Sequence, residues 1–417
     1  MIKNKNNKKI HMLVWNEFLN DARVLKEAQT LQGVGYQVTV FALHTPNKTQ
    51  EKEILASGVK VQRVARSPFW KLRGKHKKHV DNTKHVVTPV KVKSLATHRQ
   101  ILRLIARLST HAGLCYQMVK SKPDAIHAHD VNVLPTAWFA SKICRVPLVY
   151  DAHEISTSRE GYQAFRNVVG WVEKKLMPKA VATITTTDMR AKFFARAYGI
   201  ARPIVLQNRP CLSENYTSSV NSNRLRKELE LKHDDWPIIV YQGGLQQGRG
   251  LPKLVECASN VPNAYFVFIG GGRQTTELMQ LAEHLCVTGR VKFIPTVALA
   301  ELPEYTASAD IGVQPIENTC LNHFSTDSNK LFEYILAELP VVATNFPEIR
   351  KVVQQYQVGE VVPDNDLNAL VVVLNKLVCS PELREVYKGN AVKAAPHLCW
   401  QEQEHKLVEL YRQALYK

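Results

Sequence analysis

Long apolar runs, paired cysteines and common nucleotide-binding motifs are missing from this sequence. No run of about 18 apolar residues occurs among its 417 residues, so no segment is expected to span a membrane. Its eight cysteines are scattered without a C-x-x-C pair, which argues against a zinc site or a disulfide framework and favours a reducing cytoplasm. There is no G-x-x-x-x-G-K-[ST], and no G-x-G-x-x-G opens the chain, which argues against ATPases and dehydrogenases.

Acidic residues are scarce in the first half of the chain. Residues 1–208 hold 35 Lys and Arg against 13 Asp and Glu, whereas residues 209–417 hold 20 against 24. The basic excess peaks at 60–107, where 14 basic residues face one acid, Asp81. We expect 60–107 to meet an anionic membrane surface or another polyanion, and the alternative is a solvated basic loop.

Residues 99–115 predict an amphipathic helix. Arg99, Arg103 and Arg107 lie off its apolar face. Such a helix could lie on a bilayer or pack on its own domain. With the basic charge, it suggests a cytoplasmic protein held peripherally at the inner face of the plasma membrane. The residues of the apolar face are Ile101, Leu104, Ile105, Leu108, Ala112 and Cys115.

Apolar segments of strand length alternate with helical segments along the whole chain. One series runs from a strand at 9–15 to a strand at 203–208, and a polar linker follows at 209–224. A second series runs from 237–245 to 358–362, and a last helix begins near Trp400. This alternation predicts an α/β protein with two doubly wound, Rossmann-like domains, 1–208 and 209–399.

Ligands of such sheets bind beyond the carboxyl ends of the strands, and unusual residues gather there in the second domain. Paired glycines, Gly243 and Gly244, follow one strand and precede Arg249 at a helix start. Another helix start carries Lys330, and the free N–H groups expected at Asn329, Lys330 and Leu331 predict an anion site. That helix start consists of Ser325, Thr326, Asp327, Ser328, Asn329, Lys330 and Leu331.

Glu333 lies one turn into the same helix, among apolar residues typical of a buried face. A carboxylate at this place can accept hydrogen bonds from two neighbouring hydroxyls, as on a ribose. The alternative is a glutamate that only complements the helix dipole.

The first domain offers two histidine-containing strand ends. His129 and Asp130 end one strand and are expected to reach the opening, and His127 is expected to point the other way. His153 and Glu154 end the next strand, although each histidine could be an ordinary loop residue. Among the four strand-end residues no His–carboxylate pair has the i, i+4 spacing of a helix, so no metal site is expected here. The D-x-D at 364–366 is more typical of a helix cap.

Seven segments in order make the chain resemble the GT-B glycosyltransferases of retaining family 4, which include many bacterial polysaccharide and lipid-linked sugar transferases. They are "NDARVLKEAQTLQGVGYQVTVFA", "PDAIHAHD", "VPLVYDAHE", "VYQGGLQQGRGL", "VKFIPTVALAELPEYTASADIGVQPI", "SNKLFEYILAELPVVATNFPEI" and "CWQEQEHKLVELYRQAL". The resemblance implies a central cleft, with the donor held by 209–399, the acceptor held by 1–208, and the helix at 400–417 crossing back.

The resemblance also implies residue roles. Glu333 takes the place of the second Glu of an E-x7-E motif, which binds the ribose, while Ser325 replaces the first Glu, which contacts the donor sugar. Arg249 takes the place of a diphosphate-binding Lys, but Gly244 replaces its Arg partner, so Lys330 or Arg23 is expected to supply charge. The remaining expected contacts are Val297 at the base, His129 near the donor sugar, and Arg23, His153 and Glu154 near the acceptor.

The expected activity is a metal-independent, retaining hexosyl transfer from a UDP- or GDP-linked sugar to a hydroxyl of a glycan or lipid-linked acceptor. His129, Asp130, Lys330 and Arg249 are the predicted catalytic residues, with no cofactor and no nucleic acid. Two alternatives are a nucleotide-sugar 2-epimerase of the same architecture and a non-enzymatic basic nucleic-acid-binding protein, although no recognition motif for nucleic acid is present.

Overall fold

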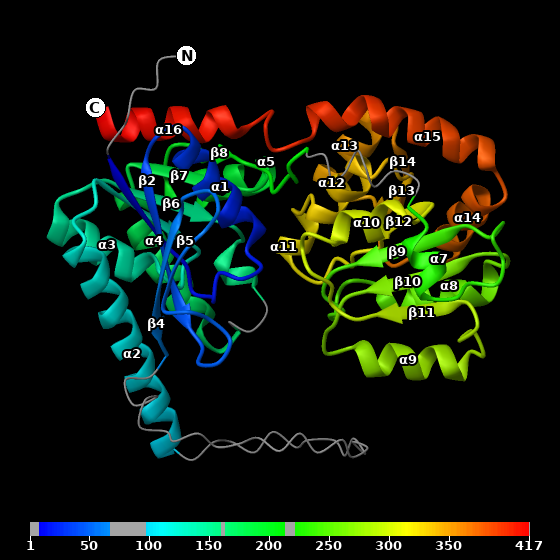
Figure 1. Cartoon of the computed structure of the whole chain (residues 1–417), viewed down its shortest axis with the longest axis horizontal. Coiled ribbons are helices and arrows are strands. Elements are labelled where there is room, and N and C mark those ends of the chain that lie inside the picture. Colours follow the sequence, from blue (N-terminus) through cyan, green and yellow to red (C-terminus); the bar gives the residue numbers. More distant parts are fainter. Residues whose placement is uncertain (1–7, 67–96, 160–162, 213–221, 417) are drawn as a thin grey trace. The chain divides into compact units, whose positions relative to one another are not determined.

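The computed structural model describes residues 8–416 apart from 67–96, 160–162 and 213–221 (Figure 1). The chain forms two compact units. The first comprises Met1–Ala152, Trp171–Thr183 and Leu410–Lys417, and the second comprises His153–Gly170 and Ile184–Glu409. None of the helices in the described ranges has the length and hydropathy that crossing a bilayer requires.

The N-terminal sheet has eight strands in the order β3-β4-β2-β1-β5-β6-β7-β8. Strand β3 runs antiparallel to β4, and the other pairings that the structure describes are parallel. The strands from β4 to β7 follow the order of a doubly wound sheet. The strand order reverses between β1 and β5, and this is the switch point of the sheet. The strands are β1 (Lys9–Leu13), β2 (Gln37–His44), β3 (Lys52–Ile54), β4 (Lys60–Ala65), β5 (Ala125–His129), β6 (Leu148–Ala152), β7 (Ala182–Thr185) and β8 (Ile204–Val205).

Helices and short 3-10 turns connect these strands. Asp21 begins α1 by accepting a hydrogen bond from the N–H of Val24, and Thr187 caps α5 in the same way through Arg190. The helices are α1 (Ala22–Gly33), α2 (Thr97–Lys120), α3 (Leu134–Cys144), α4 (Arg166–Leu176) and α5 (Asp188–Tyr198), with 3-10 turns at Ser156–Ser158, Gln163–Phe165 and Met177–Lys179.

The second sheet has six parallel strands in the order β11-β10-β9-β12-β13-β14, which is again the doubly wound order. Its central strands β9 and β10 are buried along their whole length because helices cover both faces. The strands are β9 (Ile238–Gln242), β10 (Tyr265–Ile269), β11 (Val291–Ile294), β12 (Ile311–Gln314), β13 (Val341–Thr344) and β14 (Gly359–Val362).

The helices of this second part follow the expected alternation. Asp366 caps α14 by accepting from the N–H of Ala369 at 2.9 Å, which confirms that the D-x-D segment is a helix cap. The helices are α7 (Arg224–Glu228), α8 (Leu251–Asn260), α9 (Thr275–His284), α10 (Leu302–Ala307), α11 (Leu321–Phe324), α12 (Asn329–Leu336), α13 (Pro347–Tyr356), α14 (Leu367–Val378), α15 (Pro381–Ala394) and α16 (Glu404–Tyr416), with a 3-10 turn at Ala395–His397.

The division between the units departs from a boundary at residue 208. Residues 184–208 belong to the second unit because α5 bonds to residues far along the chain. The N–H of Met189 donates to Glu348 at 2.7 Å, and Arg190 donates to the carbonyl of Asn322 at 2.9 Å. The end of α16 packs in the first unit, where the Tyr411 hydroxyl lies 3.0 Å from Nδ1 of His127.

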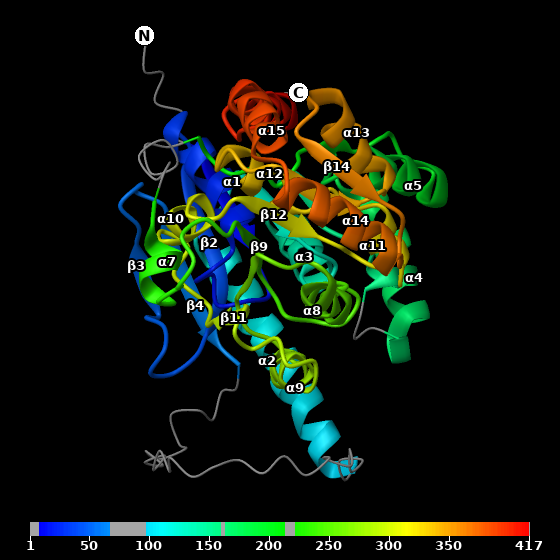
Figure 2. The same ribbon diagram turned by 90° about the vertical axis from the view of Figure 1, so that its right-hand side faces the viewer.

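Helix α2 packs through a face other than its apolar stripe. Thr110, Leu114 and Met118 are buried against the N-terminal sheet. The stripe residues Ile101, Leu104, Ile105 and Leu108 are not among the buried ones, and each is 52–59% exposed. The first turns of α2 extend beyond the strands of their sheet (Figures 1 and 2). The predicted apolar face is therefore not the one that packs on the domain.

Candidate active site

Two glycine turns of the second unit touch backbone to backbone at the carboxyl ends of β9 and β10. The N–H of Gly243 donates to the carbonyl of Ile269 at 2.8 Å. A Cβ at Gly270 would lie 2.1 Å from the carbonyl oxygen of Gly243, and both residues have positive φ, +140° and +113°. Only glycine tolerates this close approach. The exposed Gly244 continues the turn, so the backbone here is accessible to solvent.

Lys330 lies across this turn. Its Nζ is 5.2 Å from the centre of the Tyr241 ring, and a Cβ at Gly243 would approach its Cε to 2.9 Å. Burial and then the positive charge of Arg249 lower the pKa of Lys330 to about 8, while the negative charge of Glu333 opposes the shift. Two cations close enough to perturb each other create positive potential that an anion would relieve.

The start of α12 adds to this potential. Ser328 precedes the helix with a φ of +52° and makes no side-chain cap bond. First-turn N–H groups have no acceptor within a helix, so those of Asn329 and Lys330 suit an anion. The N–H of Leu331 instead donates to the carbonyl of Ser328 at 3.2 Å, and its side chain is buried in the core. The expectation of a third free N–H is therefore wrong.

The carboxylate of Glu333 is oriented by residues that the sequence did not single out. Its Oε2 accepts from Nε2 of Gln242 at 2.6 Å, and Oε1 of Gln242 lies 2.7 Å from the Thr306 hydroxyl. Gln242 is buried, whereas Glu333 is half-buried. The position of Gln242 at the strand end before Gly243 was a usable signal for it, but nothing in the sequence pointed to Thr306.

Tyr334, the residue after Glu333, anchors α12 to the sheet. Its hydroxyl lies 3.2 Å from the carbonyl of Val313 and 3.3 Å from both the carbonyl of Val240 and the N–H of Gln242. A Cβ at Gly312 would lie 2.3 Å from the Tyr334 ring. The ring therefore fills the space above the glycine in β12 and ties α12 to the ends of β9 and β12.

Ser325 does not face an open site. Its hydroxyl donates to the carbonyl of Leu321 at 2.7 Å and lies 3.2 Å from Nε of Arg190. Arg190 also donates to the carbonyl of His153 at 2.6 Å. Ser325 and the backbone of His153 thus meet at one buried guanidinium. A sugar contact by Ser325 is not apparent in this geometry, and that role stays a prediction.

Three further predicted residues have simpler surroundings. Val297 follows β11, is half-buried and packs beside the core under α12. Arg249 is also half-buried and lies between two positive-φ glycines, Gly248 and Gly250, of which the second begins α8. Glu154 lies 3.4 Å from Nε of Arg159 at a partly exposed position. Their roles at the base, diphosphate and acceptor stay predictions.

In the first unit, the prediction that His127 points away from His129 is wrong. The ring centres lie 4.1 Å apart, because residues two apart on a strand share a face. Nδ1 of His129 lies 3.5 Å from Asp151, and both histidines are buried. Asp130, half-buried with a φ of +67°, follows in the turn, and its N–H donates to the carbonyl of Asp151 at 3.0 Å.

Arg23 belongs to the same buried cluster. Its guanidinium donates to both carboxylate oxygens of Asp151, at 2.7 and 3.0 Å, and lies 3.3 Å from Glu27. Both of these donor groups are engaged by Asp151, so a contact of Arg23 with an acceptor or diphosphate would have to break this pair. The guanidinium instead holds Asp151 beside His129.

Four residues of this cluster could in principle bind a metal ion. Donor atoms of Glu27, His127, His129 and Asp151 lie within 4.8 Å of one another. Arg23 already occupies the space between both carboxylates, 2.7 Å from Asp151 and 3.3 Å from Glu27, and a cation would have to displace it. We therefore assign no metal to these residues.

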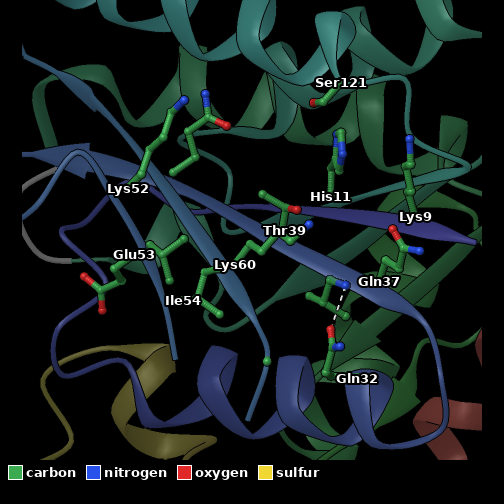
Figure 3. Close-up of a pocket in the computed structure, with 14 residues that line it drawn as sticks. Lys9, His11, Gln32, Gln37, Thr39, Lys52, Glu53, Ile54, Lys60 and Ser121 are labelled. Atoms are coloured by element: carbon green, nitrogen blue, oxygen red, sulfur yellow. Dashed lines mark hydrogen bonds between the residues drawn. The ribbon is translucent and has the colours of Figure 1, made fainter. Parts of the chain in front are cut away.

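A pocket of about 650 Å³ is lined by residues of strands β1, β2, β3 and β4 of the N-terminal sheet (Figure 3). Lys9, Lys52 and Lys60 line it together with His11, whose pKa is lowered to about 4 by burial and by Lys9. Lys9 and Lys60 begin the parallel strands β1 and β4, and Ser121 follows the end of α2, where cations complement the helix dipole. The pocket is separate from the strand ends that carry the predicted residues.

Comparisons with known proteins agree with this architecture. Residues 21–208 match the family model "Glycosyl transferase 4-like domain", and residues 222–394 match "Glycosyl transferases group 1". The chain is 22% identical over 411 residues to a D-inositol 3-phosphate glycosyltransferase of Actinosynnema mirum, covering 94% of this chain and 91% of that protein.

Solved structures resemble the whole chain. Sucrose-phosphate synthase from Thermosynechococcus elongatus has a TM-score of 0.74 at 16% identity, covering 98% of this chain and 99% of that one. The Anabaena protein HepE, in complex with UDP and glucose, has a TM-score of 0.72 at 17% identity, covering 98% of this chain and 100% of that one. At these identities the likeness establishes the fold.

Proposed function

Because the chain belongs to the GT-B glycosyltransferases of the family 4 type, we propose that it is a retaining hexosyltransferase using a UDP- or GDP-linked sugar. The proposed acceptor is a hydroxyl of a glycan or lipid-linked glycan, and no metal ion takes part. HepE, a structural neighbour, has been solved with UDP-glucose, which supports a nucleotide sugar as the donor class.

One arrangement in the second unit carries the proposal. The start of α12, Lys330 and Arg249 form a positive site beside the exposed glycine turn at Gly243. One helical turn further, Gln242 holds the carboxylate of Glu333 in place. An anion site next to an oriented carboxylate matches a nucleoside diphosphate, whose diphosphate and ribose diol are adjacent.

The proposed reaction requires stabilisation of the leaving diphosphate. The bond between the anomeric carbon and the phosphate oxygen breaks, and its electron pair leaves with the nucleoside diphosphate. The acceptor hydroxyl forms the new bond on the same face and gives its proton to the departing phosphate. Lys330, Arg249 and the N–H groups of Asn329 and Lys330 stabilise the charge that develops on that phosphate.

The first unit is proposed to supply the acceptor side. His129 and Asp130 lie at the carboxyl end of β5, next to the switch point of the N-terminal sheet. His129 is held by Asp151, and Asp151 is held by Arg23. We assign His129 to the reacting sugar and Arg23 to the positioning of Asp151, in place of a direct acceptor contact.

Docking to an anionic membrane is the second part of the proposal. Residues 67–96, the most basic part of segment 60–107, lie outside the described residues. In the described part, the exposed stripe of Ile101, Leu104, Ile105 and Leu108 stands beside the exposed Arg103 and Arg107. A helix with this composition can insert its apolar face among lipid headgroups, and each Lys or Arg near an anionic surface adds about 1 kcal/mol. The proposed location is the cytoplasmic face of the plasma membrane.

A nucleotide-sugar panel tests the donor assignment. The purified chain is incubated with UDP- and GDP-linked hexoses alone, and the release of UDP or GDP is measured. Slow hydrolysis of one donor, lost in Lys330→Ala, is the expected result. Isomerised nucleotide sugar without release would point to the epimerase, and the absence of both binding and turnover across the panel would refute the proposal.

A further inference from the structure

An aromatic and cationic cluster stands at the carboxyl end of β1, outside the residues assigned above. Trp15 follows this strand by two residues, and its ring stacks on His111 of α2 with centres 4.1 Å apart and planes 9° apart. The guanidinium carbon of Arg107, one turn earlier on α2, lies 5.1 Å from the centre of the Trp15 ring. Trp15 as a whole is half-buried.

Arg107 provides the charge of this cluster. It is exposed, and its Nη2 donates to Oδ1 of Asn132 at 3.1 Å. Among the residues that the structure describes, no carboxylate pairs with it. Burial and the charge of Arg107 lower the pKa of His111 to about 4, so the imidazole is neutral near pH 7, and its Nδ1 lies 2.8 Å from the Thr136 hydroxyl.

The cluster lies where a doubly wound sheet binds its ligand. Trp15 follows β1 and Asn132 follows β5, and these two strands flank the switch point of the N-terminal sheet. Three contacts hold the cluster together: the Trp15–His111 stack, the Arg107–Asn132 hydrogen bond and the His111–Thr136 contact. The positions of Trp15 and Arg107 are therefore fixed before a ligand arrives.

The two groups suit one kind of ligand. An indole ring offers a flat apolar surface to the C–H face of a sugar, and a guanidinium offers a fork of N–H donors to a phosphate. We propose that Trp15 and Arg107 form an acceptor subsite for a phosphate-bearing sugar. This rests on the proposed glycosyl transfer. The exposed Leu104 and Leu108 beside Arg107 suit a lipid-linked form, and a soluble glycosyl phosphate shares the same head chemistry.

Fluorine NMR can test this subsite directly. The chain holds six tryptophans, so labelling with 5-fluorotryptophan gives a small spectrum in which Trp15→Phe identifies the Trp15 signal. With UDP or GDP present, the protein is titrated with glucose 1-phosphate, glucose and inorganic phosphate. A parallel titration uses a polyprenyl glucosyl phosphate in neutral vesicles.

The Trp15 signal should move with glucose 1-phosphate at lower concentration than with glucose or phosphate. Arg107→Gln should weaken the glucose 1-phosphate response about ten-fold, the scale of one charged hydrogen bond, and leave the glucose response unchanged. Arg350→Gln is the matched control, because Arg350 is also exposed and donates to an asparagine, Asn345, at 3.2 Å.

The two titrations separate the possible sources of the phosphate. A response that is much stronger with the polyprenyl form assigns a lipid-linked acceptor, and equal responses assign a soluble one. A Trp15 signal that no glycosyl phosphate moves would overturn the subsite, as would equal effects of Arg107→Gln and Arg350→Gln. If UDP and GDP themselves fail to bind in calorimetry, the proposed function has failed instead.

Discussion

Replacing Glu333 by alanine tests the nucleoside end of the proposed donor site. The carboxylate is half-buried, and Gln242 fixes one of its oxygens through a 2.6 Å hydrogen bond. It can therefore accept from a ribose diol without first losing much side-chain entropy. Glu333 is the residue that we assign to the ribose, so its removal tests this assignment directly.

The expected loss is about 2 kcal/mol, because hydrogen bonds to a charged group are each worth about 1.5–3 kcal/mol and water replaces them in the free protein. This corresponds to a dissociation constant for UDP or GDP that rises about 30-fold. Glu333→Gln keeps the shape and one acceptor oxygen, so its dissociation constant should rise about five-fold.

Titration calorimetry measures these constants, with thermal unfolding as the control. Glu333→Ala leaves the buried Nε2 of Gln242 without this partner, so the free energy of unfolding should fall by about 1 kcal/mol while the protein stays folded. Gln242→Ala should weaken binding less, and the double variant should lose less than the sum of the two. Unchanged nucleotide affinity in Glu333→Ala, or strict additivity with Gln242→Ala, would refute the reasoning.

The remaining predictions concern charge, packing and the membrane. Burial lowers the pKa of Lys330 to about 8, and a bound diphosphate must raise this pKa, so the affinity for UDP or GDP should fall up to ten-fold per pH unit above pH 8. Lys330→Arg should remove this pH dependence. An affinity of the native protein that does not change with pH would contradict the prediction. Gly312→Ala should destabilise the fold by about 1–3 kcal/mol in denaturant unfolding, because the new Cβ meets the Tyr334 ring at 2.3 Å, and unchanged stability would argue against this packing. Leu108→Glu should reduce sedimentation with anionic liposomes. Val372→Glu is the control, at a position 65% exposed on α14, and should leave sedimentation unchanged. Equal effects of the two substitutions would count against docking through α2.

The fold could be predicted because parallel strands buried on both faces are short apolar runs separated by helical segments. Two helices, α3 and α8, each carry a proline in their first turn, a position that favours the start of a helix. The short β3 and α7 carry too few residues for a periodic signal. The sequence alone also gave no sign that α5 bonds to residues more than 100 positions later.

The site was predicted unevenly, for physical reasons. Lys330 and Glu333 could be found because their roles follow from their position on one helix. Arg23 was misjudged because its partner, Asp151, lies 128 positions away and only folding brings the two charges together. The error at His127 came from a misapplied strand period, since residues two apart always share a face. The stacking of Trp15 on His111 depends on tertiary packing that no local pattern encodes.

A crystal structure with UDP or GDP bound is the most direct test of the central claim, that the second unit holds a nucleotide-sugar donor at the start of α12. The account predicts the diphosphate beside the N–H groups of Asn329 and Lys330, within reach of Lys330 and Arg249, and the ribose hydroxyls on Glu333. A nucleotide bound elsewhere, or bound without a contact between its ribose and Glu333, would contradict it.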